Sequence, residues 1–158
     1  MQKQILKGVT MLMLIAGVVL MAAVVSAHAQ SSSSVVADIP FEFTVGGKSL
    51  KAGEYSVKPF TANGVALLIS NQDSYDSAIR LTISIQARNV AQQGKLVFHR
   101  YGQRYFLSEV WTSGERMGRQ LQKSGEERAI ESQLAAISSK SELARSSYER
   151  VEIVAMVR

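Results

Sequence analysis

Histidine, cysteine and serine side chains are the first place to look for catalytic or metal chemistry in this sequence. His99 is the only histidine outside the N-terminal segment, and the sequence has no cysteine. Transition-metal sites usually draw on several His or Cys ligands, and thiol catalysis needs a cysteine. A Gly-x-Ser-x-Gly elbow and a Gly-rich phosphate loop are both missing. The sequence therefore predicts no metal centre and no cofactor, and we interpret His99 as a packing residue.

Carboxylates offer a second kind of chemistry. Asp38, Glu42, Glu54 and Glu109 lie on or beside expected strands, and a carboxylate pair at the right separation hydrolyses glycosidic bonds. A domain of this size is small for a sugar cleft. The loop over residues 71–76 is rich in oxygen ligands, but it lacks the spacing and the closing Glu of a calcium loop. We interpret it as a plain polar loop.

Aromatic residues gather between positions 98 and 111. Those that face outward could stack on a sugar or a peptide, whereas those that face inward would form the core. Trp111 lies at the end of an expected strand and is expected to be the most exposed of them. Trp111, Tyr101, Tyr105 and His99 are therefore the candidate binding residues.

The N-terminus has the three parts of a secretory signal peptide. Lys3 and Lys7 precede an uncharged apolar run over residues 9–25, and Ala27 and Ala29 place small residues where signal peptidase reads them. We expect residues 1–29 to be cleaved and residues 30–34 to form a Ser-rich lead-in. The protein is then periplasmic or extracellular, without a stable membrane anchor. An uncleaved anchor is the alternative, because the run is close to the shortest length that spans a bilayer.

Size and charge limit the remaining possibilities. The 158 residues suit one domain, over residues 35–158, that folds by burial alone because it has no disulfide. The net charge of +5 includes the two leader lysines, and the other basic and acidic residues are interspersed along the chain. No basic stripe is present, so the sequence predicts no nucleic-acid binding.

The region over residues 35–112 is typical of short antiparallel strands. Residues 39–45 alternate apolar and polar side chains, and Gly46-Gly47 predicts a two-residue hairpin turn. Asn63-Gly64 predicts a second hairpin, which would pair Phe60 with Leu67. A turn at Gly102-Gln103 predicts a third hairpin, in which Phe98, His99 and Arg100 lie opposite Leu107, Phe106 and Tyr105.

The C-terminal part changes character. Ser124 and Glu127 have the spacing of a capping box, and apolar residues then recur at helical steps, which predicts an amphipathic helix over about residues 125–144. Alternation resumes in an expected strand over about residues 151–157. The predicted fold is an antiparallel β-sandwich or small β-barrel of about seven to eight strands with one C-terminal helix, which covers an open end or packs on one sheet.

Three runs of residues carry a resemblance to known proteins: 37–48, 50–57 and 96–111. They are similar to those of a family of small exported proteins from environmental bacteria, over roughly residues 37–128. The resemblance implies export and a β-rich domain, and it transfers no functional residue.

These observations favour a non-enzymatic domain of the envelope or extracellular space that acts by binding or as a structural component. An envelope protein or a glycan is the expected partner. The alternative is a small hydrolase or ligand carrier whose site is assembled around His99 or the strand carboxylates. A pocket that converges on those residues would favour the alternative, and a filled interior would favour the first function.

Overall fold

The structure is a computed structural model that describes residues 34–137 and 148–158. The expected signal peptide, most of the Ser-rich lead-in and the expected helical residues 138–144 lie outside the described residues. One helix and ten strands are present in the described part: β1 (Val35–Ile39), β2 (Phe43–Val45), β3 (Lys48–Leu50), β4 (Gly53–Pro59), β5 (Ala66–Asn71), β6 (Ser77–Gln86), β7 (Gly94–Tyr101), β8 (Arg104–Trp111), β9 (Met117–Leu121), α2 (Gly125–Ile137) and β10 (Glu149–Val157).

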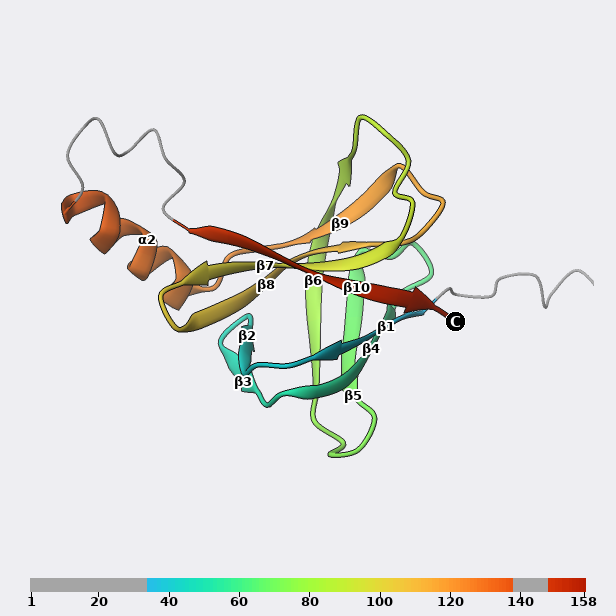
Figure 1. The fold of residues 1–158 in the computed structure, drawn as a ribbon, viewed down its shortest axis with the longest axis horizontal. Helices are drawn as coiled ribbons and strands as arrows, with labels where there is room; N and C mark the ends of the chain where they lie inside the picture. Colours follow the sequence, from blue (N-terminus) through green and yellow to red (C-terminus); the bar gives the residue numbers. More distant parts are fainter. Residues whose placement is uncertain (1–33, 138–147) are drawn as a thin grey trace, which may run out of the picture. The chain divides into compact units, whose positions relative to one another are not determined.

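Eight of the strands form a closed antiparallel barrel, which decides between the two expected architectures (Figure 1). Going round the wall, the order is β8-β7-β10-β1-β4-β5-β6-β9, and β9 pairs back to β8. The last strand enters the barrel between β7 and β1, as the return of residues 151–157 to the sheet predicted. A closed wall leaves few free strand edges, which protects a strand-rich protein against edge-to-edge association.

The remaining two strands make a hairpin beside the ring. The Gly46-Gly47 turn is confirmed: both glycines have positive φ, of 56° and 92°, and Val45 pairs with Lys48. The expected strand over residues 39–45 is wrong in one respect, because Pro40 lies in a break between β1 and β2. Arg80 of β6 holds this hairpin, because its guanidinium donates to the carbonyls of Val45 and Gly46.

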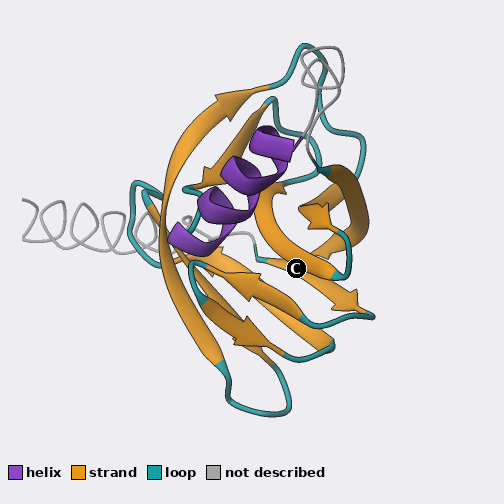
Figure 2. Cartoon of the chain, turned by 90° about the vertical axis from the view of Figure 1, so that its left-hand side faces the viewer, coloured by secondary structure: helices purple, strands orange, loops and turns teal. Residues whose placement is uncertain are grey.

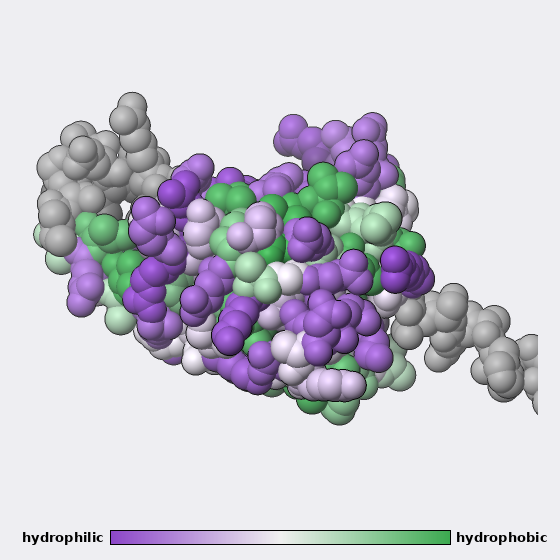
Figure 3. Space-filling view, turned by 60° about the horizontal axis from the view of Figure 1, so that its bottom comes forward, coloured by the Kyte–Doolittle hydropathy of each residue, from purple (hydrophilic) through white to green (hydrophobic). Residues whose placement is uncertain are grey.

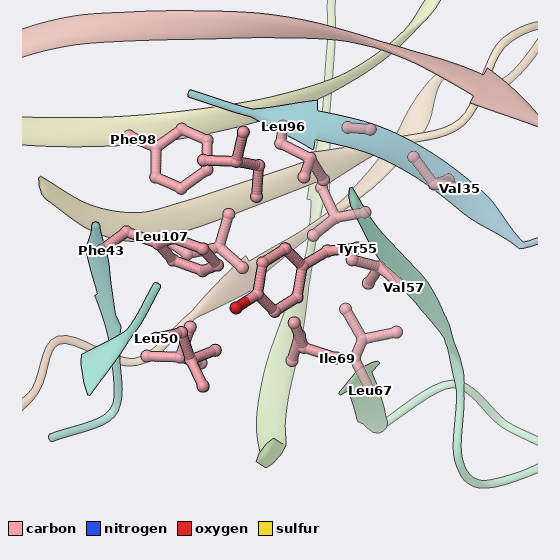
Figure 4. Close-up of a cluster of buried hydrophobic side chains, with 14 of the residues drawn as sticks. Val35, Phe43, Leu50, Tyr55, Val57, Leu67, Ile69, Leu96, Phe98 and Leu107 are labelled. Carbon is pink, nitrogen blue, oxygen red and sulfur yellow. The ribbon is translucent and has the colours of Figure 1, made fainter. Parts of the chain in front are cut away.

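The barrel interior is filled by apolar side chains (Figure 4). Tyr55, Phe43 and Phe98 are the largest members, and the phenol of Tyr55 donates to the carbonyl of Lys51 at 2.8 Å. Phe43 meets Tyr55 and Phe98 edge to face at centroid distances of 5.0 and 5.4 Å. An eight-stranded barrel is just wide enough for such side chains.

Residues 79–85 alternate apolar and polar side chains as a strand does, but in β6 the apolar ones do not face the core. Its small and polar residues face inward, where Ala78 joins the core and the buried Thr82 hydroxyl donates to the carbonyl of Gly64. Ile79, Leu81 and Ile83 face outward and are exposed. Apolar side chains reach the surface elsewhere too, and Figure 3 shows hydrophobic residues interspersed among hydrophilic ones on one face.

Helix α2 is attached to the barrel mainly through its first turn (Figure 2). The Ser124 hydroxyl accepts the Glu127 N–H at 3.0 Å, which confirms the expected helix start. Beyond Glu131 the helical side chains are exposed as far as their burial is described, to residue 136. Of the two expected placements of the helix, packing on one sheet is therefore wrong for this part of it. Of the described segments, no helix combines the length and apolar character that crossing a membrane requires.

Matched leucine substitutions test the outward direction of the apolar side chains of β6. Leu96→Ala removes a side chain that is 0 % exposed and is expected to lower the free energy of unfolding by about 2–5 kcal/mol. Leu81→Ala removes one that is 61 % exposed and is expected to cost less than about 1 kcal/mol. Urea unfolding of the two variants measures both values. A large cost for Leu81→Ala would contradict the outward assignment.

Candidate functional site

The outer face of β7, β8 and β10 carries two of the buried polar groups of the described chain, His99 and Glu109. On β7, Leu96 and Phe98 face the core, so Lys95, Val97 and His99 face outward. On β10 the residues opposite these three are Val154, Glu152 and Arg150. Side chains of these two neighbouring strands therefore share one outward surface.

A β-bulge in β8 brings Glu109 and Trp111 onto the same surface. Val97 lies opposite Glu109 whereas Phe98 lies opposite Leu107, so Ser108 is an extra residue. Leu107 and Val110 both face the core as a result, and Glu109 and Trp111 face outward.

Arg150 and Glu109 form a bidentate ion pair across β7. The two guanidinium nitrogens donate to the two Glu109 oxygens at 2.9 and 3.0 Å. The Trp111 indole N–H donates to the same carboxylate at 2.7 Å. Val97 lies on the strand between them and is 0 % exposed although it faces outward. The pair therefore joins the last strand to β8 and covers an apolar residue on the outside of the barrel.

Glu152 and Lys95 extend this network. Arg150 Nε donates to Glu152 Oε1 at 3.0 Å, and Lys95 Nζ donates to both Glu152 oxygens at 2.9 and 3.0 Å. The hydrogen bond from Lys95, helped by Arg150, holds the pKa of Glu152 below its usual value. Burial lowers the pKa of Arg150, but its bonds to Glu109 and Glu152 outweigh that effect and raise the pKa overall. Arg150 is thus a permanent cation.

A hollow with a volume of about 570 Å³ opens beside this network. One wall is the connection between β6 and β7, and the other is the outer face just described. The lining residues are Ala87, Asn89, Val90, Ala91, Gln92, Gln93, Gly94, Lys95, Trp111, Arg150, Glu152 and Val154. We call this hollow the outer cleft.

Backbone hydrogen bonds tie the connecting wall of the outer cleft to the turn between β8 and β9. Ala87 and Ala91 donate to the carbonyls of Arg116 and Glu115 at 2.9 and 3.0 Å. Gly114 donates back to Ala91 at 2.8 Å, and the Ser113 hydroxyl donates to the Gln92 carbonyl at 2.9 Å. The wall is therefore fixed before any ligand arrives.

His99 belongs to a second cluster, where α2 meets the barrel. Its Nδ1 lies 2.8 Å from Glu127 Oε1, and its ring stacks on Tyr148 with centroids 3.8 Å apart. The Tyr101 phenol donates to the same Glu127 oxygen at 3.4 Å, and burial, followed by the nearby Glu127 charge, raises the pKa of Tyr101. Glu127 thus bonds to β7 instead of completing the capping box with its side chain. This cluster anchors the helix.

The structure places the other sequence-predicted residues as follows. Trp111 is 7 % exposed, so its expected exposure is wrong: the ring packs on Gly118, where an added Cβ would come within 2.6 Å of it. Tyr101 is buried, and Tyr105 stacks on Phe41 with centroids 3.9 Å apart. The hairpin register expected around Gly102-Gln103 is confirmed.

The candidate carboxylates do not form one site. Asp38 and Glu54 are direct cross-strand neighbours on the outside of β1 and β4, and Asp38 is exposed. Glu42 accepts a hydrogen bond from Ser49, and Glu109 belongs to the network of Arg150. Within residues 34–137 and 148–158, no three His, Asp or Glu residues are grouped to hold a metal ion. The 71–76 loop is organised by Asn71 Oδ1, which accepts the N–H groups of Asp73 and Ser74.

Comparison with known proteins adds no function to this geometry. No protein-family model, curated protein or solved structure matches the chain. Sequence reasoning missed Arg150, Glu152 and the amide-bearing residues of the 87–93 connection. The alternation of residues 151–157 was the one signal available for Glu152, because it predicted that Glu152 points away from the core.

Glu127→Ala is expected to release α2 from the barrel. It removes the partner of the buried His99, so the free energy of unfolding should fall by about 1–3 kcal/mol. Amide hydrogen exchange should show lost protection in α2 with little change in β7. The matched control is Glu126→Ala, whose partner Arg104 lies at the exposed surface and whose loss should cost less than about 1 kcal/mol. Equal protection of α2 in both variants would refute the anchoring role.

The lowered pKa of Glu152 predicts a pH dependence of stability. A carboxylate with a depressed folded-state pKa stabilises the protein above its unfolded value of 4.5, and this contribution is lost as the pH falls through the folded pKa. Glu152→Gln should therefore flatten the decline of thermal stability below pH 4.5. Lys95→Met should flatten it as well, because Lys95 is the largest cause of the shift. A decline as steep as that of the wild type in both variants would contradict this assignment.

Proposed function

We propose that this chain is an exported, non-enzymatic domain of the envelope or extracellular space that acts by binding a partner at the outer cleft. Export is supported by the pattern of residues 1–29. Binding is supported by the combination of a filled barrel interior and a shaped hollow on the outside. The observation that carries the proposal is the fixed wall of the outer cleft beside the Arg150 network.

The same geometry argues against the alternative functions. A carrier that stores its ligand inside the barrel needs empty space, whereas this interior is occupied by large side chains such as Tyr55 and Phe98. A hydrolase that uses His99 needs an accessible imidazole, yet the side chains of His99 and Glu127 are only 4 % and 5 % exposed. Glu109 has both oxygens engaged by Arg150 and Trp111. These contacts favour structural roles for both groups.

Export is tested by intact-mass measurement after cell fractionation. The full chain, expressed in a bacterium, should be found outside the cytosol with Gln30 as its first residue. Ala29→Arg places a large cation where signal peptidase requires a small residue, so the uncleaved chain should accumulate. Ser33→Arg, which lies beyond the cleavage site, should be processed normally. Uncleaved wild-type protein in the cytosol would refute export.

Binding is tested on the same fraction. Amine crosslinking of the exported protein in intact envelopes should give a complex that purifies with it, and Lys95 places a reactive amine in the outer cleft. If the protein gave no crosslinked complex and was also not retained by isolated envelope glycan, the binding function would be refuted.

A further inference from the structure

We infer that the ligand of the outer cleft is a neutral saccharide chain. This inference rests on the proposed binding function and names its ligand class. It is carried by three features of the lining: charges that are already paired, amide groups without a hydrogen bond to any described residue, and exposed aliphatic side chains.

The charges at the outer cleft neutralise one another. Lys95 pairs with Glu152, Glu152 with Arg150, and Arg150 with Glu109, which gives two cations and two anions in one chain of contacts. An ionic ligand would have to compete with one of these pairs, and the bidentate Arg150–Glu109 pair is the hardest to open. A neutral ligand leaves them all intact. The lining therefore favours a ligand without net charge.

The connecting wall supplies hydrogen-bonding groups for a polar ligand. Asn89, Gln92 and Gln93 line the outer cleft, and all three are exposed. Within the described residues, their side-chain amides form no hydrogen bond. Each amide offers two donor hydrogens beside an acceptor oxygen. Neighbouring hydroxyls of a sugar ring both donate and accept, so they match such amides, whereas an apolar ligand would bury them unpaired.

Aliphatic side chains complete the match. Val154 and Val90 line the same cleft and are 65 % and 45 % exposed. A sugar ring has polar edges and faces made of C–H groups, and those faces can cover such side chains while the edges meet the amides. The hollow lies at the surface and is not an enclosed cavity, so a chain of linked sugars can run along it.

Trp111 is a built-in reporter for this inference, because it is the single tryptophan of the chain and it lines the outer cleft. The exported protein is titrated with the neutral oligosaccharides maltohexaose and fully N-acetylated chitohexaose, and with oligogalacturonate as an acidic probe. We expect at least one neutral probe to change the Trp111 emission saturably. Calorimetry should give the same Kd.

Two variants locate the binding. The double variant Asn89→Ala and Gln92→Ala removes two amides and should weaken the neutral probe about tenfold, from the loss of two hydrogen bonds. Gln133→Ala, on the exposed part of α2, is the matched control and should bind like the wild type. Unchanged binding by the double variant would place the site elsewhere and overturn the inference.

The outcomes separate this inference from the proposed function. Binding of oligogalacturonate alone, weakened by salt, would overturn the neutral ligand class but leave a binding domain. No response to any probe, from a protein that still forms a crosslinked complex in the envelope, would overturn the saccharide and leave a protein partner. No response to any probe and no complex would refute both.

Discussion

The extra residue in β8 is the constraint on which the site depends. If Ser108 were an ordinary strand residue and not a bulge, strict alternation from Leu107 would point Glu109 and Trp111 into the barrel and Val110 out of it. An interior that already holds Tyr55 and Phe98 has no room for a tryptophan and no partner for a carboxylate. The bulge moves both side chains to the outside, where Arg150 meets Glu109 and Gly118 accommodates the indole. One unpaired residue thus converts the end of a core strand into the wall of a cleft.

The network of Arg150 also explains how the chain end is held. Pairing of β10 with β1 covers Val35 with Val157 and Val36 with Met156 and is extended by reciprocal backbone hydrogen bonds between Ser34 and Arg158, whereas its pairing with β7 covers seven residue pairs. Contacts that reach across β7 to β8 therefore add to the hold on β10, whose other edge is paired over a shorter length. The same contacts bury Val97 from the outside, so part of the barrel wall is covered on both faces. One set of hydrogen bonds therefore both stabilises the position of β10 and fixes the geometry of the site.

Much of the fold could be predicted from local patterns, because turns and caps are local. Gly46-Gly47 and the register of the hairpin around Gly102 follow from turn chemistry, and Ser124 marks the helix start. Asn63-Gly64 was misleading: Gly64 alone has positive φ there, its N–H donates to Thr61, and Leu67 pairs with Pro59 instead of Phe60. The chain forms a wider loop between β4 and β5, because tertiary contacts set the register of these two strands.

The alternation of apolar and polar residues does not show which set of side chains faces the core. The pattern of β6 is a correct strand signal, yet its isoleucines face outward, whereas Thr82 faces inward and Arg80 reaches the β2–β3 hairpin. The direction of the Trp111 side chain could not be predicted for the same reason, because a bulge reverses the alternation of side chains within one strand. Long-range pairs such as Arg150 with Glu109 and His99 with Glu127 carry no local signal at all.

The size of the barrel explains why its polar site lies outside. The interior of the eight-stranded barrel is packed with side chains, so a ligand site within it would remove part of the core that holds a cysteine-free domain together. The outer wall is convex, and side chains on a convex surface diverge, so a hollow needs a second wall. The connection from β6 to β7 provides that wall, and the β8–β9 turn fixes it through main-chain hydrogen bonds. The cleft therefore exists because loop and strand are held against each other independently of any ligand.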